Sequence, residues 1–439
     1  MFNPLIRAIV MPATCVIGLQ WGDEAKGKVV DVLTQKNEIC VRYQGGANAG
    51  HTVKFGGQAF KLSLIPSGIF HHNVKSVVAN GVVLDPARFL EEIEGLTSRG
   101  VQVDADNLAL SNRLHVIMPW HFLEDRIMNS LCAHEPIGST MRGIGQCYRD
   151  KVGRSMAFRL GDLYLPSFPE RLKEVTQIKN QYLYGMNPDG GKEQVSYSET
   201  LEKYTAYAEK LKPMVTDTTA FLLNAVDADK NVLFEGAQGA LLDIDHGTFP
   251  FVTSSNSSGV GVCAGAGIPA KFVKNVVGIM KAYTTRVGGG PFPTEQDNEI
   301  GQKIRDAGHE YGTVTKRPRR CGWFDAVAVR YTSRLSGVTM LSLMLLDVLD
   351  QMPEISICTA YEINGERTTD FPALVEDLYE VKPVYETMPG WMSDTTGCRN
   401  YSDLPDNAKR YVERLQEIVG AKVGIVSVGP DREQTIFVN

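Results

Sequence analysis

The residues with the clearest capacity for chemistry lie between Gly22 and Lys28, where the chain reads G-D-E-A-K-G-K. Two glycines separated by four residues, the second followed by lysine, match the loop that cradles phosphates between a strand and a helix. The match is partial, because Val29 stands where the pattern places a serine or threonine that binds magnesium. A metal at this loop must therefore take an oxygen ligand from elsewhere.

Asp23 and Glu24 are the unusual residues of this loop. The N-terminus of a helix attracts anions, and a carboxylate placed there without purpose repels phosphates. One carboxylate can coordinate a magnesium ion that bridges to phosphate, or it can act as a base on a second substrate. The simpler alternative is an ordinary strand, turn and helix, in which the acids cap the helix and the lysines are solvated.

A second glycine-rich loop follows the next apolar run and reads RYQGGANAGHTV from Arg42 to Val53. Its glycines permit close approach of the backbone to a ligand, and Asn48 and His51 offer polar groups at the rim. A single histidine is commonly structural. One that closes a glycine loop, near a loop with an acid and a lysine, predicts a donor to developing phosphate charge.

Apolar, β-branched runs predict the strands that position both loops. Most are continuously apolar, which is typical of parallel strands covered by helices on both faces. We therefore predict an α/β fold with a large, mostly parallel central sheet flanked by helices. The predicted strands are 15–18, 39–43, 74–79, 232–234, 276–283, 338–346, 355–361 and 423–428, and the predicted helices are 85–99, 201–212, 216–226, 324–334 and 405–419.

Two long segments, 136–165 and 236–270, are rich in glycine, serine, threonine and proline and lack periodicity. Loops of that length in a compact domain are commonly functional. No stretch has the polar composition of a flexible linker, so we predict a single domain over residues 1–439, with residues 1–13 as an N-terminal extension.

Composition excludes several classes of function. The net charge of −6 argues against generic binding of nucleic acid or anionic membranes, which requires broad basic surfaces. Pro12 breaks the N-terminal apolar run well short of a membrane span, which favours a cytoplasmic protein. The eight cysteines are scattered, without zinc-binding spacing, so we expect free buried thiols.

The two loops, with other segments in order along the chain, resemble the adenylosuccinate synthetase family, ligases that use GTP to join aspartate to IMP. The resemblance covers essentially the whole chain and implies a GTP-binding, P-loop-like ligase fold with long functional loops. It also implies a cytoplasmic homodimer that catalyses the first committed step of AMP biosynthesis from IMP. The segments that carry it are WGDEAKGK, QGGANAGHT, IPSGI (65–69), NGVVLDP (80–86), FEGAQGALLDIDHGTFPFVTSSN (234–256), RVGGGPFPTE (286–295), YETMPGW (385–391) and VGPDR (428–432).

The resemblance implies a mechanism. Asp23 takes a proton from ring nitrogen 1 of IMP and ligates one Mg²⁺ per subunit, with the backbone carbonyl of Gly50 as another ligand. The 6-oxygen attacks the γ-phosphate of GTP to give 6-phosphoryl-IMP, and aspartate displaces that group to give adenylosuccinate, GDP and phosphate. His51 stabilises the phosphates, and Lys26 and Lys28 neutralise them. The catalytic residues implied are Asp23, His51, Lys26 and Gln238.

The resemblance also implies three binding sets and a second subunit that supplies Arg154 to the IMP site. For GTP they are Gly22, Asp23, Glu24, Ala25, Lys26, Gly27, Lys28, Gly50, His51, Thr52, Arg319, Leu345, Leu346, Asp347, Ser427, Val428 and Gly429. For IMP they are Asp23, Glu24, Ala25, Lys26, Asn48, Ala49, Gly50, His51, Thr140, Arg154, Gln238, Thr253 and Arg317. For L-aspartate they are Thr313, Val314, Thr315, Lys316, Arg317, Pro318 and Arg319.

Several positions depart from the family pattern. Ala25 and Met141 replace glycines, Gln146-Cys147 replaces Pro-Ala, and Val314 and Lys316 replace threonine and glycine. The guanine motif T-K-L-D reads M-L-L-D at 344–347, which keeps the aspartate and loses the lysine that lies over the base, and 427–429 reads S-V-G instead of S-T-G.

Two alternatives remain open. One is a paralogous purine-nucleotide ligase that uses ATP, another acceptor or another amine, although relatives that accept a 2-aminopurine lack the loop aspartate and Asp23 thus favours a hypoxanthine acceptor. The other is a GTPase switch or nucleotide-binding regulator without ligase activity.

Overall fold

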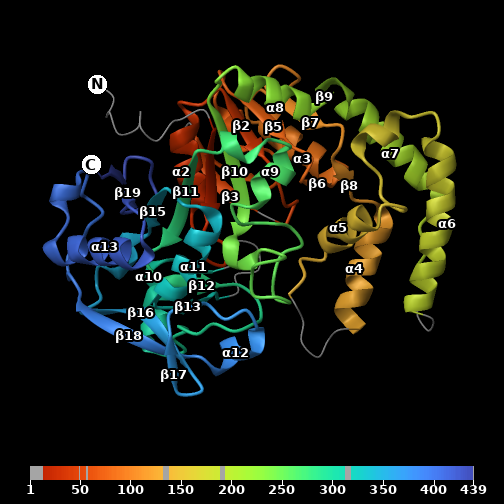
Figure 1. Cartoon of the computed structure of the whole chain (residues 1–439). Helices are drawn as coiled ribbons and strands as arrows, with labels where there is room; N and C mark the ends of the chain where they lie inside the picture. Colours follow the sequence, from red (N-terminus) through yellow and green to blue (C-terminus); the bar gives the residue numbers. More distant parts are fainter. Residues whose placement is uncertain are drawn as a thin grey trace.

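The computed structural model of the chain describes residues 13–48, 50–55, 58–131, 138–187, 193–311 and 318–438, with the side chains at 51, 52, 54 and 55 outside that description. Within these residues, ten strands form a central sheet in the order β20-β19-β15-β11-β1-β10-β2-β5-β7-β9 (Figure 1). Neighbouring strands pair in parallel except β19 and β20. The predicted fold class is confirmed.

The predicted strands are present, with bounds that differ by a few residues. The central sheet contains β1 (Ala13–Gly18), β2 (Ile39–Arg42), β5 (Lys75–Val78), β7 (Leu108–Ser111), β9 (Val215–Thr216), β10 (Val232–Gly239), β11 (Asn275–Lys281), β15 (Met340–Met344), β19 (Val423–Ser427) and β20 (Thr435–Phe437). Ala13, predicted as part of the extension, is the first residue of β1 and pairs with Val232.

The predicted strand 355–361 lies outside this sheet. It forms β16 (Glu354–Ile363), which pairs with β14 (Phe324–Asp325), β17 (Glu366–Thr368) and β18 (Lys382–Pro389) in a smaller sheet. The other strands form short pairs: β3 (His51–Phe55) with β4 (Gln58–Leu62), β6 (Val83–Leu84) with β8 (His115–Val116), and β12 (Thr284–Arg286) with β13 (Arg320–Gly322).

Helices cover both faces of the sheet, as continuous apolar strands require. The α-helices are α2 (Lys26–Thr34), α3 (Pro86–Thr97), α4 (Pro119–Leu131), α5 (Ile144–Gly153), α6 (Phe168–Met186), α7 (Tyr197–Leu211), α8 (Thr218–Asp227), α9 (Gly261–Ala266), α10 (Glu299–Ala307), α11 (Ala326–Ser336), α12 (Val375–Glu380) and α13 (Asp406–Val419).

Alternate side chains of β1 pack against different helices on the two faces of the sheet. Val16 packs with Val29 and Leu33 of α2 on one face. Ile17 belongs to the core on the other face, which includes Leu222 of α8 and residues of α11 and α13. Because β1 is buried on both sides, the loop that follows it starts from a fixed position.

A further core lies beside the sheet, where α3, α4, α6 and α7 stand together (Figure 1). It contains Trp120 of α4, Leu172 of α6 and Ala208 of α7, all nearly inaccessible to solvent. This helical layer supports the segment that carries Thr140.

The structure corrects the prediction that residues 136–165 form a long loop. Segment 136–165 contains α5 and a 3₁₀ helix at Leu160–Tyr164, so its prediction as a long loop is wrong. Ile144, Cys147 and Tyr148 are buried at helical spacing, but the pattern covers too few turns to stand out. Asp85 caps α3, accepting a bond from the Arg88 N–H at 3.2 Å.

The seven cysteines in the described ranges are free thiols, and Cys132 lies outside them. Of the helices that the structure describes, none has the length and apolarity needed to span a membrane.

Candidate active site

A cavity of about 860 Å³ lies where strands of the central sheet end. Its lining follows the carboxyl ends of β1, β2, β10, β15 and β19, the edge at which open α/β sheets bind ligands. It brings the two predicted loops together with distant segments. The predicted site residues that line it are Gly22, Asp23, Glu24, Ala25, Lys26, Gly27, Lys28, Asn48, Gly50, Thr140, Gln238, Thr253, Arg319, Leu345, Ser427 and Gly429.

Other predicted residues are placed differently. The side chains of Leu346 and Val428 are buried in the hydrophobic core and not in the cavity. Val428 continues the alternation of β19, and Leu346 begins the 3₁₀ helix Leu346–Leu349 that follows β15. Arg154, Pro318 and Asp347 are not among the cavity-lining residues. Ala49, Thr313, Val314, Thr315, Lys316 and Arg317, and the side chains of His51 and Thr52, lie outside the described residues.

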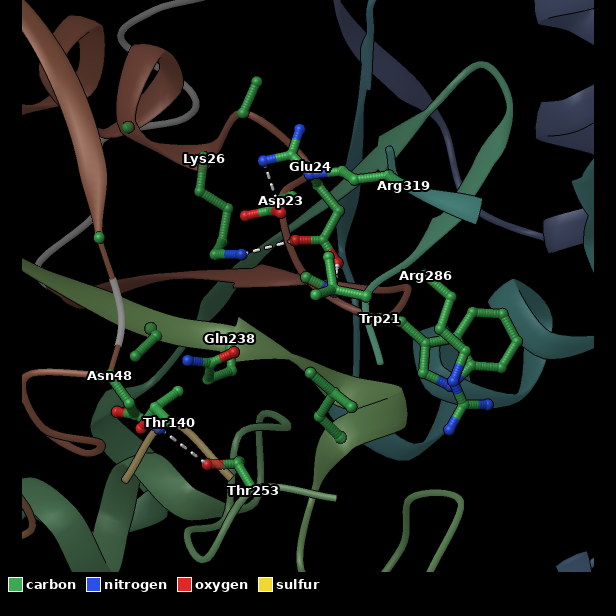
Figure 2. Close-up of a pocket in the computed structure, with 18 of the residues that line it drawn as sticks. Trp21, Asp23, Glu24, Lys26, Asn48, Thr140, Gln238, Thr253, Arg286 and Arg319 are labelled. Carbon is green, nitrogen blue, oxygen red and sulfur yellow. Dashed lines mark hydrogen bonds and ion pairs between the residues drawn. The ribbon is translucent and has the colours of Figure 1, made fainter. Parts of the chain in front are cut away.

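Glu24 holds the first loop in shape. Its side chain is fully buried, and Oε1 accepts the N–H groups of Gln20 at 3.1 Å and Gly22 at 2.8 Å. Oε2 pairs with the Lys26 ammonium at 2.6 Å (Figure 2). Gly239 passes so close that a Cβ there would lie 2.6 Å from Oε1. Glu24 is therefore committed to the loop itself.

Asp23 faces the cavity instead. Its side chain is 39% exposed, and Oδ2 lies 2.9 Å from a guanidinium nitrogen of Arg319 (Figure 2). Asp23 has a φ of 58°, and this left-handed backbone turns neighbouring carboxylates in different directions. The sequence left the roles of the two acids open, and their burial separates them.

A buried acid anchors Arg319. Glu310 accepts from Arg319 Nη1 at 2.6 Å, from Lys281 Nζ at 2.5 Å and from the Tyr283 hydroxyl at 2.6 Å. Burial acts to raise the pKa of Glu310, but Lys281 and Arg319 outweigh it and hold that pKa below its usual value. Burial acts to lower the pKa of Arg319, but the negative charges of Asp23 and Glu310 outweigh it, so this pKa is raised above its usual value. Both groups are therefore ionised near neutral pH.

One end of the cavity carries amide and hydroxyl groups. The Asn48 amide donates to Thr253 Oγ1 at 3.4 Å, and its own carbonyl oxygen is buried without a partner among the described residues. Gln238 lies in the same region and has a φ of 62° (Figure 2). A buried acceptor without a partner and a strained polar residue are typical of a ligand site.

Asp125 holds the segment that carries Thr140 at this end. Its carboxylate accepts from Ser139 Oγ at 2.7 Å and from the Gly143 N–H at 2.9 Å. Arg142 then donates to the Ala47 carbonyl at 2.6 Å, which connects this segment to the second loop.

Arg286 contributes a buried cation beside the first loop. Its guanidinium lies over the ring of Trp21, at 5.0 Å (Figure 2). It also lies over the ring of Phe251, at 5.9 Å. It donates to Thr248 Oγ1 at 3.2 Å and to the Pro291 carbonyl. Burial lowers its pKa to about 9. Arg286 thus fixes the 286–291 segment against the loop that contains Asp23.

The cavity lining also contains Leu345, which follows β15, and Ser427 and Gly429 at the end of β19. Leu345 replaces the lysine of the family motif and has a φ of 59°. Nearby, one carboxylate oxygen of Asp347 is buried without a partner among the described residues, and burial raises its pKa to about 6.

Sequence reasoning missed Asp125, Arg286 and Glu310. Arg286 begins the recognised segment 286–295, and Glu310 precedes the predicted aspartate-binding residues 313–319, but the charge of a residue carries no signal of its burial. Only the fold shows that each is enclosed and bonded to a segment of the cavity wall.

The comparisons with known proteins agree with one another. A model of the adenylosuccinate synthetase family matches residues 15–436. The adenylosuccinate synthetase of Heliobacterium modesticaldum is 52% identical over 430 residues, which cover 97% of this chain and 99% of that protein.

Solved structures give the same result. A fully ligated adenylosuccinate synthetase from Plasmodium falciparum superposes with a TM-score of 0.89 at 37% identity, covering 98% of this chain and 100% of that one. A succinoaminodeoxyadenylate synthetase from cyanophage S-2L, bound to dGMP and to dATP as energy donor, has a TM-score of 0.60 at 19% identity, covering 98% of this chain and 95% of that one. The second likeness concerns the fold alone.

Proposed function

The chain belongs to the adenylosuccinate synthetase family, and we propose that it joins L-aspartate to IMP with GTP, giving adenylosuccinate, GDP and phosphate. It is a ligase that forms a C–N bond. The observation that carries the substrate assignment is one cavity that Asp23 shares with Asn48 and Thr253, predicted for IMP, and with Ser427, predicted for GTP.

Asp23 is the base in this proposal. Of the two acids of the first loop, Asp23 has the exposed carboxylate, whereas that of Glu24 is buried and bonded to the loop, so Asp23 accepts the proton of purine nitrogen 1. Arg319 holds this carboxylate at 2.9 Å. Because Glu310 also binds Arg319, the guanidinium retains a buried partner when nucleotide draws it away from Asp23.

Asp23 and Gly50 would hold Mg²⁺. Both line the cavity, and Asp23 offers a hard carboxylate oxygen. Apart from its chain neighbours, no heavy atom of the described residues lies within 4 Å of a Cβ built on Gly50. Among the described residues no three acidic, histidine or cysteine side chains gather around one point, which suits a cation that takes its other oxygens from phosphates and water. When bound, Mg²⁺ supplies positive charge beside the phosphates.

The remaining roles follow from placement. Lys26, 12% exposed and paired with Glu24, brings positive charge to the loop, and the predicted role of His51 toward the phosphates remains a proposal. Asn48, Thr140, Thr253 and Gln238 bind IMP. Arg154 lies outside the lining of its own cavity, which supports its action on a second subunit of a cytoplasmic homodimer.

An assay of the purified protein tests the proposal. With Mg²⁺, IMP, aspartate and GTP, we expect adenylosuccinate and inorganic phosphate to appear in equal amounts, with much slower turnover when ATP replaces GTP. Phosphate without adenylosuccinate would instead identify a nucleotide switch. Faster product formation with ATP would identify a ligase with an altered donor, as the loss of lysine at Leu345 allows.

A further inference from the structure

Lys28 does not point along the phosphate loop. Its ammonium donates to Ser427 Oγ at 2.9 Å, to the Gly429 carbonyl at 2.8 Å and to the Gln434 carbonyl at 3.0 Å. A lysine has three N–H donors, so these acceptors use all of them. All three acceptors belong to one segment, 427–434, which joins β19 to β20.

This segment, called here the C-terminal turn, is held closed by its own bonds. The Gln434 carbonyl also accepts the Val428 N–H at 3.0 Å, and Ser427 Oγ donates to the Gly429 carbonyl at 3.2 Å. Lys28 therefore binds the turn at the point where its two strands meet. Ser427 and Gly429 line the cavity where β19 ends, whereas Asn48 follows β2, which lies on the other side of β1 in the sheet order.

A second tie joins the same turn to the same helix. Arg432 donates through Nε to Asp31 Oδ2 at 2.9 Å, one turn of α2 beyond Lys28. The other Asp31 oxygen lies 3.1 Å from His71 Nε2. Asp31 is buried, so its carboxylate needs these partners. The helix that starts at the phosphate loop is thus bonded twice to the C-terminal turn.

The surroundings of Lys28 also suit a structural cation. Burial lowers its pKa to about 8, against the opposing effects of Asp347 and Asp431. A lysine that neutralises phosphates must keep donors free for them, whereas the donors of Lys28 are satisfied within the protein.

We propose that Lys28 is a positioning residue for the nucleotide base: it fixes Ser427 and Gly429 as the wall of the base site and does not bind phosphate. This inference rests on the proposed use of GTP. It replaces the role that the family resemblance implied for Lys28, and it links the phosphate loop to the base wall through α2.

Binding of guanosine, GDP and GTP to Lys28→Met, with IMP saturating, tests the proposal. If the substitution displaces the wall of the base site, the dissociation constants of all three ligands should rise by the same factor. We expect this factor to be about tenfold, for the loss of one set of hydrogen bonds. A phosphate ligand would instead leave guanosine unaffected and cost progressively more from GDP to GTP, and that gradient would overturn the proposal. Lys422→Met, at an exposed lysine just before β19, is the matched control and should bind as wild type.

Two further variants keep the test decisive if Lys28→Met does not fold. Ser427→Ala keeps the cation and should weaken guanosine, GDP and GTP alike. Asp31→Asn removes a negative charge near the cavity, and we expect it to weaken the binding of all three ligands equally. Tighter binding of GTP would instead mean that the main effect is reduced repulsion between Asp31 and the phosphates. Turnover of the wild-type protein with GTP tests the proposed function separately. The proposed function and the proposed role of Lys28 can therefore be rejected independently of each other.

Discussion

At the scale of single residues, burial gives different roles to two adjacent carboxylates, those of Asp23 and Glu24. The carboxylate of Glu24 is buried, accepts hydrogen bonds from two loop N–H groups and pairs with Lys26, whereas that of Asp23 is exposed to the cavity. The residue types alone do not separate them, since both are acids in one loop, and only the family resemblance pointed to Asp23 as the base. The separation comes from the left-handed backbone at Asp23 and at Ala25.

Asp23→Asn tests the role of that exposed carboxylate. The amide keeps size and polarity but cannot take a proton, so we expect kcat to fall by ~10²–10⁴ while GTP binding changes little. Steady-state kinetics and direct nucleotide binding measure the two effects. Parallel loss of binding and turnover would indicate that Asp23 acts chiefly through metal or structure.

Ala25→Gly tests the strain in the same loop. Ala25 precedes α2 with φ 60° and ψ 31°, a conformation that costs a residue with a Cβ roughly 1–2 kcal/mol. Glycine removes this cost but gains freedom in the unfolded chain, so we expect the free energy of unfolding to rise by about 0.5–1 kcal/mol in urea titrations. Ala206→Gly, on the exposed face of α7, should lower it by about 1 kcal/mol. A destabilised Ala25→Gly protein would mean that the Cβ makes a needed contact.

At the scale of elements, the sequence predicted most of the central sheet and the helices α3 and α7, but it did not predict α4, α5 and α6. Continuous apolar runs identify buried strands such as β1 and β11, because both faces are covered. In contrast, α4, α5 and α6 bury charged side chains, including Glu124, Asp150 and Lys179, so their apolar stripes are interrupted. Which charges are internal depends on partners from other helices, and that information is not local in sequence.

Lys179→Met tests this buried network. Lys179 of α6 lies 2.9 Å from Glu124 and 2.7 Å from Asp150, and His121 also binds Asp150 at 2.9 Å. Burial acts to raise the pKa of Asp150, but His121 and Lys179 outweigh it and lower the pKa to about 2. Removing Lys179 leaves buried carboxylates without their main cation, so the free energy of unfolding should fall by about 3–5 kcal/mol.

The sign of the pH dependence adds a check on Lys179→Met. A depressed carboxylate pKa stabilises the fold above the unfolded pKa, roughly pH 4, and that stability is lost as the pH falls toward 2. The deficit of the variant should therefore be largest near neutral pH and shrink in acid. Lys173→Met, on the exposed face of the same helix, should change stability little at any pH. An equal deficit across the pH range would assign the loss to packing.

At the scale of the whole molecule, the cavity exists only because the topology brings remote segments to one edge of the sheet. Asp23 follows β1, Gln238 lies near the end of the neighbouring strand β10, and Ser427 ends β19, which β15 and β11 separate from β1. The family resemblance selected most of these residues. It could not place Lys28 on the C-terminal turn or Leu346 and Val428 in the core, because those outcomes depend on how each side chain packs.

Arg154 extends the argument to two chains, since it ends α5 with a φ of 67°, is exposed, and does not line its own cavity. If it completes the site of a partner, Arg154→Leu and Asp23→Asn should each be nearly inactive alone. After subunit exchange, an equal mixture should regain about one quarter of wild-type activity, because half of the dimers are mixed and one of their two sites has both native residues. Mixing Asp23→Asn with the double variant should restore nothing. Exchange without recovery, or full activity of Arg154→Leu, would place the IMP site within a single chain.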